Sequence, residues 1–162
     1  AATARAVARA DEGAAVDAVR PCLGLSPGEW DGAPTQLGHT IRDRLNDPSL
    51  ASISLFNYLD ARDGAAFVAA WLERAESAPS GEVFFVGAED ALAVEELASL
   101  LPRLVPATAE SAHTLTGTAP AFSSAKAHEY LGWRATRSGR TELRSHETLI
   151  PQRPTAALEA QQ

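Results

Sequence analysis

Methionine is absent from the 162-residue sequence, and cysteine occurs once, as Cys22. A chain without methionine does not include a translation start, so we expect these residues to be a processed or partial chain. A single thiol cannot form a disulfide within the chain, and sparse cysteine fits a reducing compartment. We therefore expect a cytoplasmic protein.

Long apolar runs, an excess of positive charge and closely spaced histidines are also missing. No segment has the roughly 20 consecutive apolar residues that a membrane-spanning helix needs. The net charge of −7 disfavours nucleic acid and anionic membranes as partners. No metal site is expected, because no two histidines have the short spacing of paired zinc ligands. The four histidines are His39, His113, His128 and His146.

The residues that are present indicate a globular chain. Hydrophobic residues make up 45% of the sequence and charged residues 22%, a balance typical of folded proteins rather than disordered ones. The length favours one domain, and a chain of this size buries roughly two-thirds of its unfolded surface.

In the first third of the chain the patterns predict helix, strand, loop and helix in turn. An Ala-rich stretch over 2–10 favours a helix, and 14–19 is typical of a strand that Arg20-Pro21 ends. Gly, Pro and Ser residues predict a loop over 22–36, and helix signals resume at Pro34. The apolar stripe of this helix is expected to consist of Leu37, Ile41 and Leu45, with Arg42, Asp43 and Arg44 off the stripe.

Acidic residues mark the start of the next helix. Residues 53–57 alternate and predict a short strand. Asp60 then stands where an N-cap belongs, with Asp63 three residues later, and carboxylates there stabilise free N–H groups and the helix dipole. We interpret both acids as capping residues; a functional role is the alternative. The buried face of this helix is predicted to consist of Phe67, Val68, Trp71, Leu72 and Ala75.

A second strand and a second long helix are predicted after residue 80. The apolar run 83–86 lies between glycines, which favours a parallel strand covered on both faces. Apolar residues then repeat helically over 92–101 and stop near Pro102, with Asp90 as a possible cap.

The remaining residues predict one short helix between irregular segments. Residues 102–122 are typical of a loop. Ser123 or Ser124 is expected to cap the short helix, which Gly132 ends. No clear periodicity follows residue 144.

Four segments, taken in order, resemble a known family: residues 57–66, 81–87, 94–98 and 124–133. Together they are similar to the C-terminal half of an extended short-chain dehydrogenase/reductase of the NAD-dependent epimerase/dehydratase family, over about residues 1–140. The resemblance implies α/β architecture, with two strands of a Rossmann-type parallel sheet and a small, mainly helical substrate-binding lobe.

The same resemblance suggests how the chain is divided. Residues 1–144 would form the substrate-binding half, and 145–162 a tail that we expect to be mobile. The N-terminal dinucleotide-binding half would then be missing from this chain. For the first 20 residues, a generic helix–Gly–strand unit is the plain alternative.

The resemblance also implies where a site lies. In the family, the residues just after Arg-Pro pass beside the nicotinamide, which implicates Pro21, Cys22 and Leu23 in cofactor binding. The substrate cleft would be lined by Ser26, Trp30, Phe56, Asn57 and Tyr58. For every one of these residues, an ordinary packing role is the alternative.

The catalytic pair of the family is absent. The family uses Tyr-x-x-x-Lys, because one helical turn places both side chains on the same face. Here the only tyrosines, Tyr58 and Tyr130, are followed four residues later by Arg62 and Arg134, and the only lysine is Lys126. A Gly-x-Gly-x-x-Gly fingerprint is also absent. We therefore assign no catalytic residue, and we do not expect this chain alone to bind NAD(P), the family's cofactor.

One departure from the family bears on the substrate. Nucleotide-sugar epimerases of the family carry an arginine near the position of Phe56, where it grips the diphosphate. Phenylalanine cannot do so, which favours a less charged carbonyl or hydroxyl substrate. Arg42 and Arg44 remain alternative phosphate contacts.

Residues 24–28 match Gly-x-Ser-x-Gly, the nucleophile elbow of α/β-hydrolases. In that motif the residue after the serine donates a backbone N–H to the oxyanion hole, and a helix follows. Here that residue is Pro27, which has no N–H, and we expect no helix directly after it. A hydrolase is therefore disfavoured.

We interpret the chain as the substrate-binding half of an NAD(P)-dependent oxidoreductase or epimerase, catalytically incomplete by itself. Its expected partners are a small-molecule substrate and either the missing Rossmann half or further copies of the chain. The alternative is a stand-alone, non-catalytic binding or interaction module.

Overall fold

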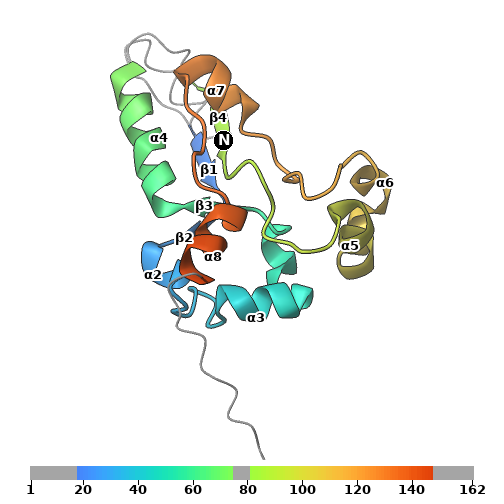
Figure 1. Cartoon of the computed structure of the whole chain (residues 1–162). Coiled ribbons are helices and arrows are strands. Elements are labelled where there is room, and N and C mark those ends of the chain that lie inside the picture. Colours follow the sequence, from blue (N-terminus) through green and yellow to red (C-terminus); the bar gives the residue numbers. More distant parts are fainter. Residues whose placement is uncertain (1–17, 75–80, 148–162) are drawn as a thin grey trace, which may run out of the picture.

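Two pairs of parallel strands form the centre of the molecule. The computed structural model describes residues 18–74 and 81–147. Strand β1 (Ala18–Pro21) pairs with β4 (Val83–Val86), and β2 (Leu23–Leu25) pairs with β3 (Tyr58–Asp60). Helices lie beside both pairs (Figure 1). The predicted α/β class and the parallel pairing of β1 with β4 are confirmed, whereas the β2–β3 pair was not predicted.

The two strand pairs meet at Cys22, the only residue between β1 and β2. Cys22 N–H donates to the Val86 carbonyl at 3.0 Å, and Ala88 N–H donates to the Tyr58 carbonyl at 2.8 Å. The segment 18–25 therefore passes from pairing with β4 to pairing with β3. A Cβ atom on Gly87 would lie 2.8 Å from Cys22 Sγ and 3.3 Å from the Tyr58 carbonyl oxygen, so a larger residue at this crossing would force its neighbours to shift.

One face of the β1–β4 pair is covered by α4 (Ala61–Arg74) and α7 (Ala125–Leu131), which lie beside it in Figure 1. The Phe67 ring packs edge-on against Phe84 and Trp133, with centroids 5.9 and 5.4 Å away. The buried residues of this cluster are Leu59, Phe67, Phe84, Val86, Ala127, Leu131 and Trp133.

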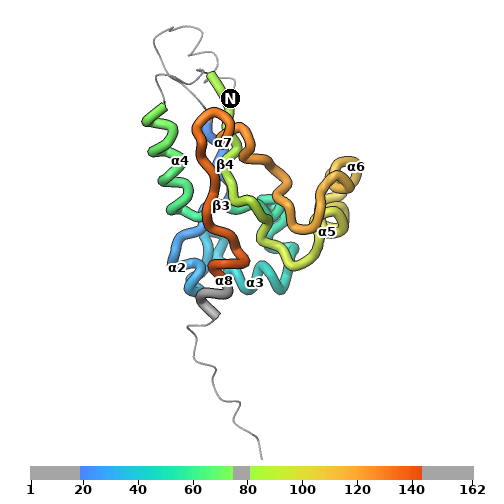
Figure 2. Tube along the Cα trace, turned by 45° about the horizontal axis from the view of Figure 1, so that its top comes forward, coloured from blue at the N-terminus to red at the C-terminus, as the bar shows by residue number. Residues whose placement is uncertain are grey.

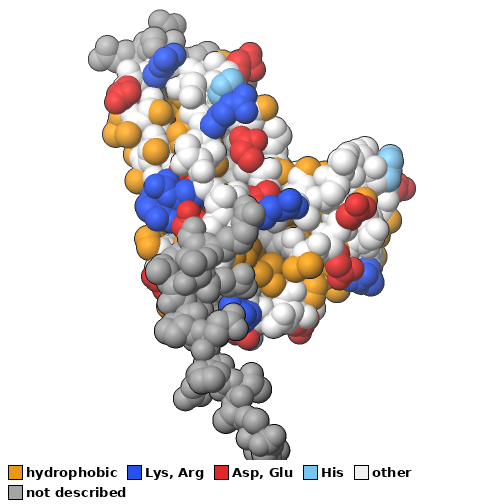
Figure 3. Space-filling view, in the orientation of Figure 1, with side chains coloured by type: hydrophobic (Ala, Val, Ile, Leu, Met, Phe, Trp, Pro, Cys, Tyr) orange, Lys and Arg blue, Asp and Glu red, His pale blue; other side chains and the backbone are white. Residues whose placement is uncertain are grey.

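The opposite face of β4 is only partly covered, which corrects the prediction of a strand buried on both sides. Phe85 remains 37% exposed. The predicted buried face of α4 is also wrong in part, because Val68 and Leu72 are 51% and 63% exposed. Figure 3 shows hydrophobic side chains along the outer side of α4. Only the stripe through Phe67 and, in part, Trp71 faces the core.

A helical lobe lies to one side of the strands (Figure 2). It contains α5 (Leu97–Leu104), the 3-10 turn η2 (Pro106–Thr108) and α6 (Ala109–Ala112). Phe56 and Ala51, from the segment before β3, pack into it. Its buried residues are Ala51, Phe56, Ala91, Leu97, Leu100, Leu101 and Ala112.

A third cluster joins three short helices to β2 and β3. These helices are α2 (Pro27–Trp30), α3 (Ile41–Asn46) and α8 (Gly139–Glu147). The buried members of the cluster are Leu25, Trp30, Ile41, Tyr58, Ala88 and Leu92, and Leu143 of α8 packs against them. Helix α2 and strand β2 lie in the stretch 22–36, which the sequence predicted to be a loop.

Helix α3 begins later than predicted. Gly38 has a positive φ of 81°, which ends any helix started at Pro34, and Leu37 is exposed. Thr40 caps the helix instead, since its Oγ1 accepts the Asp43 N–H at 3.1 Å. Arg44, expected to lie off the apolar stripe, is in fact 1% exposed.

The strand predicted over 53–57 does not form. A 3-10 helix, η1 (Pro48–Ser54), runs into Leu55 and Phe56, whose φ angles of 48° and 62° are left-handed. Such angles are uncommon for residues other than glycine and cannot continue a strand. The strand begins only at Tyr58.

The boundaries near the C-terminus also differ. Helix α5 begins at Leu97 and runs through Pro102 to Leu104, and the stretch predicted as a loop, 102–122, contains η2 and α6. Asp90 does not cap α5; it accepts a hydrogen bond from Tyr58.

Helix α7 is confirmed at both ends. Ser124 stands at its N-cap, and Gly132 takes the left-handed C-cap conformation, with a φ of 67°. Helix α8, which extends past residue 144 to Glu147, was not predicted. The helix predicted over 2–10, most of the strand predicted over 14–19, Ala75 and residues 148–162 lie outside the described residues.

Among the described residues, no helix combines the length and the apolarity that crossing a membrane requires. No group of three or more His, Cys, Asp or Glu residues in the same part of the chain could hold a metal ion.

Candidate functional site

A groove of about 470 Å³ lies at the carboxyl end of β1. Pro21, Cys22 and Leu23, the three residues predicted to contact a cofactor, form one of its walls. The structure thus brings this predicted set together at one place. The described residues that line the groove are Arg20, Pro21, Cys22, Leu23, Ile53, Ser54, Leu55, Phe85 and Phe122.

The opposite wall comes from the end of η1. Ile53 is 82% exposed, and Ser54 Oγ donates a hydrogen bond to the Ala51 carbonyl at 3.2 Å. The left-handed backbone at Leu55 and Phe56 makes these neighbours diverge: Leu55 lines the groove, whereas Phe56 is buried in the α5 lobe. Left-handed angles at two consecutive bulky residues are strained, and such strain is often found at functional sites.

Two aromatic rings close the groove. Phe85 and Phe122 stack in parallel, with centroids 5.0 Å apart and an interplanar angle of 2°. Both rings remain more than one-third exposed. The two rings therefore leave adjoining apolar surface open at the groove.

The Asn57 side chain connects the η1 wall of the groove to Phe122. Its Nδ2 donates to the carbonyls of Ser54 at 3.0 Å and Leu55 at 2.9 Å, and its Oδ1 accepts the Phe122 N–H at 3.3 Å. The side chain is buried and does not line the groove. Asn57 therefore sets the distance between the η1 wall and Phe122, which is a positioning role.

Among the described residues of the lining, Arg20 alone carries a charge. The Cys22 thiol is half-buried, and this burial raises its pKa, so the thiol stays protonated at neutral pH. The groove therefore combines apolar walls with one cation and an unreactive thiol.

Ser26 lies outside the groove, at the exposed N-cap of α2. It forms a capping box with Glu29, whose carboxylate accepts the Ser26 N–H. A helix does follow Ser26 directly, which corrects our expectation. Even so, Ser26 has ordinary extended backbone, with φ −85° and ψ 162°, and Pro27 supplies no N–H. A nucleophile elbow needs a strained turn at the serine, so the geometry is that of a helix cap.

Trp30 and Tyr58 are buried in one cluster and are not among the described residues that line the groove. Their rings meet edge to face, with centroids 5.6 Å apart. The Tyr58 hydroxyl donates to Asp90 and accepts the Gly139 N–H. Burial, followed by the nearby Asp90 carboxylate, raises the pKa of Tyr58 far above its ordinary value. Tyr58 therefore stays protonated, with its hydroxyl already engaged.

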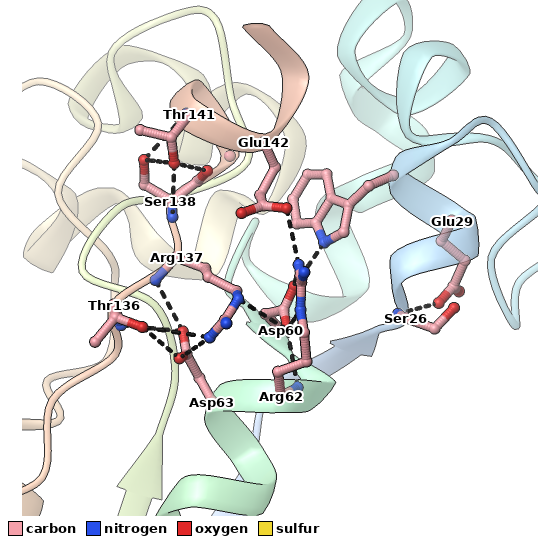
Figure 4. Close-up of polar contacts among 12 residues, drawn as sticks. Ser26, Glu29, Asp60, Arg62, Asp63, Thr136, Arg137, Ser138, Thr141 and Glu142 are labelled. Atoms are coloured by element: carbon pink, nitrogen blue, oxygen red, sulfur yellow. Dashed lines mark hydrogen bonds and ion pairs between the residues drawn. The ribbon is translucent and has the colours of Figure 1, made fainter. Parts of the chain in front are cut away.

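The two acids at the start of α4 belong to a polar network that Figure 4 shows. Asp60 accepts the Arg62 N–H at 2.8 Å and two hydrogen bonds from the Arg62 guanidinium at 2.9 and 2.7 Å. Trp30 Nε1 donates to the same carboxylate at 2.9 Å. Burial alone would raise the pKa of Asp60, but the hydrogen bonds from Arg62 and Trp30 outweigh it and lower the pKa.

Asp63 fastens the segment between α7 and α8. Its carboxylate accepts the backbone N–H groups of Thr136 at 3.0 Å and Arg137 at 2.9 Å, and their side chains at 2.8 Å each. Arg62 adds an ion pair to Glu142 of α8 at 2.8 Å. The capping interpretation of Asp60 agrees with its bond to Arg62 N–H, whereas the attachment made by Asp63 was not foreseen.

Several groove residues were missed in the sequence. Phe85 was assigned to a buried strand, and Phe122 to a loop. The sequence identified Arg20 as part of the Arg-Pro motif, but nothing in the sequence predicted that its charged side chain lines a groove. Nothing in the sequence predicted the left-handed backbone at Leu55, because such backbone is normally predicted from glycine or asparagine.

No protein-family model matches the chain. A search of curated proteins also finds no match.

Two solved structures are similar to it. The first is RMD from Pseudomonas aeruginosa complexed with NADPH, with 16% identity, a TM-score of 0.47, and coverage of 91% of this chain and 51% of that one. The second is a short-chain dehydrogenase/reductase superfamily protein from Agrobacterium tumefaciens with bound NAD, with 17% identity, a TM-score of 0.44, and coverage of 80% and 48%. The chain spans about half the length of the structures it matches.

Proposed function

We propose that the chain is the substrate-binding half of an NAD(P)-dependent oxidoreductase or epimerase and needs a dinucleotide-binding half for catalysis. The observation that carries this proposal is the groove at the carboxyl end of β1, with Pro21, Cys22 and Leu23 as one wall. Ligands of parallel α/β sheets bind outside the carboxyl ends of the strands. The order of the motifs along the sequence agrees with this placement.

Each wall has its own part in this proposal. Pro21, Cys22 and Leu23 would border the nicotinamide and keep water from it, since Pro21 has no N–H and Cys22 carries an uncharged thiol. The η1 wall and Phe122, held apart by Asn57, would contact the substrate. NAD(P), when bound, supplies hydride chemistry. The tyrosine and lysine that move the proton in the family would come from the other half.

The proposed substrate is a carbonyl or hydroxyl compound rather than a nucleotide sugar. Phe56 stands near the position at which the family's nucleotide-sugar epimerases carry an arginine. Its side chain is buried among apolar residues of the α5 lobe and offers no charge to the groove. A diphosphate would lack a bidentate partner there.

The test compares the chain alone with the chain joined to an upstream Rossmann half that carries Tyr-x-x-x-Lys. We expect calorimetric titration of the chain alone with NADH and NADPH to show no saturable binding. The glycine turn and the ribose-binding acid that hold a dinucleotide are missing from its sequence. The joined protein should oxidise NAD(P)H in the presence of a small carbonyl compound.

A control variant ties activity to the groove. Ile53→Trp fills the groove from its exposed η1 wall and should abolish turnover, whereas Val68→Trp on the exposed side of α4 should not. Low-micromolar binding of NADPH by the chain alone would contradict the proposal. A joined protein that is folded and binds NADPH but remains inactive with every small carbonyl compound would favour the stand-alone module.

A further inference from the structure

The lining of the groove is chemically one-sided. Of the nine described residues that line it, six are apolar: Pro21, Leu23, Ile53, Leu55, Phe85 and Phe122. In the part of the chain that the structure describes, no aspartate or glutamate lines it, although the whole sequence carries a net charge of −7. An anion that approaches the groove therefore meets apolar side chains and a single positive charge.

Arg20 lies where it can hold such an anion. It is the register partner of Phe85 in the β1–β4 pair, and register partners project from the same face of a sheet. Arg20 is solvent-exposed. Among the described residues, no group forms a hydrogen bond or ion pair with it. Its guanidinium is free to form a bidentate pair with a carboxylate.

The other polar groups of the lining compete little for a ligand. The Ser54 hydroxyl proton is given to the Ala51 carbonyl, and the Cys22 thiol is a weak donor. The volume of about 470 Å³ lies within the range of small-molecule sites. Recognition in the groove thus rests on apolar contact plus one charge at the Arg20 end.

We infer that the groove selects a small amphipathic acid, with an aromatic or branched apolar body against Ile53, Leu55 and Phe122 and one carboxylate paired with Arg20. As a statement about the substrate, this inference rests on the proposed function, because the acid would also carry the carbonyl or hydroxyl group. As a statement about binding, it holds for the chain alone.

Two probes of nearly equal shape separate the charge from the apolar body. 6-Fluoro-2-naphthoate and its neutral amide are titrated into the 162-residue chain and followed by fluorine NMR, which detects bound probe in monomers and oligomers alike. The acid should bind about 10-fold more tightly than the amide, the discrimination expected of one charge-assisted pair.

Substitutions place the binding in the groove. Arg20→Gln should remove the preference for the acid and leave amide binding unchanged. Arg42→Gln, an exposed arginine on α3 outside the lining, should leave the preference intact. Ile53→Ala should weaken both probes by about the same few-fold factor, because it removes apolar contact without touching the charge. Arg20 and Ile53 are both exposed, so their variants should keep the wild-type melting temperature.

Three results would overturn the inference: equal binding of the two probes, a preference for the acid that survives Arg20→Gln, or no binding of either probe. The third result would be expected if a second copy of the chain filled the groove. These failures differ from failure of the proposed function. If the joined protein prefers the acid but transfers no hydride, the proposed enzyme function is wrong and this inference stands. If the joined protein turns over neutral carbonyl compounds and shows no preference for acids, this inference is wrong and the proposed enzyme function stands.

Discussion

The indole Nε1 of Trp30 donates a hydrogen bond to Asp60 Oδ2 at 2.9 Å, across 30 residues of sequence. The same carboxylate caps the first turn of α4 through the Arg62 N–H. Asp60 therefore holds α2 and α4 to one point at the end of β3. Neither helix position is set by local sequence alone.

The first prediction concerns acid. The folded-state pKa of Asp60 lies below its unfolded value, so its contribution to stability is present above the unfolded pKa of about 3.9. That contribution is lost as the pH falls through the lower folded pKa. Between neutral pH and pH 2, wild type should lose more free energy of unfolding than Asp60→Asn, as measured by urea melts followed by tryptophan fluorescence.

Glu110→Gln is the control for this experiment. Glu110 is exposed on α6, and its replacement should leave the acid dependence as in wild type. Parallel acid curves for wild type and Asp60→Asn would refute the assignment.

The second prediction concerns Asp63. Replacement by alanine leaves four donors of Thr136 and Arg137 without their acceptor, and we expect a loss of about 3 kcal/mol in the free energy of unfolding. Amide hydrogen exchange should rise over 136–143 before it rises in α4. Thr136→Val removes the hydroxyl bond to Asp63 and the longer bond that the hydroxyl accepts from Arg137 at 3.3 Å, but it leaves the two backbone bonds to Asp63, and it should cost about 1 kcal/mol. Unchanged protection over 136–143 in Asp63→Ala would show that other contacts hold this segment.

The third prediction concerns the strand crossing. Gly87→Ala forces a Cβ against Cys22 Sγ and the Tyr58 carbonyl, and it should destabilise the protein by about 1–3 kcal/mol. Gly24→Ala, in β2, meets nothing within 4 Å and is the matched control. Adding Cys22→Ala to Gly87→Ala should recover at least about 0.5 kcal/mol, since the contact with sulfur is gone. Strict additivity of the two substitutions in thermal melts would argue against the contact.

The fourth prediction concerns association. In the described part of the chain, β1 and β4 pair only with each other, and Phe85 and Phe122 lie open beside them. Apolar surface next to an unpaired strand edge favours contact with further copies. Light scattering should therefore detect species larger than one chain, and Phe122→Lys should reduce them.

Val68→Lys is the control here, because it adds the same charge at an exposed apolar residue on α4. It should leave the association unchanged. A clean monomer with a sharp cooperative melt would mean that these elements complete a core of their own. That result would favour the stand-alone module.

The parts of the fold that sequence patterns predicted are those with local causes. The apolar run 83–86 predicted β4 and its parallel partner, and Gly132 predicted the end of α7. Pro21, Cys22 and Leu23 lie together in one groove wall, because neighbours along one extended segment stay together in any fold, and their contact with a cofactor stays a prediction.

The parts that escaped prediction depend on distant partners. Helix α2 forms within a Gly- and Pro-rich stretch where Trp30 reaches Asp60, and α8 begins where the Gly139 N–H reaches Tyr58. No window of neighbouring residues contains either contact. Asn57 connects the walls of the groove, a role visible only once Phe122 is placed beside it, and its contact with a substrate stays a prediction.

Cys22, the single residue between β1 and β2, also restricts how the length of the chain can vary. Successive residues of a strand point to opposite faces, so one residue more or fewer at this point would exchange the two sides of β2. Leu25, now fully buried, would turn outward, and Gly24 would take its place. The exposed turn over 31–34 has no such restriction and should accept an insertion. The segment between the groove wall and the core can therefore gain or lose residues only in pairs if Leu25 is to stay buried.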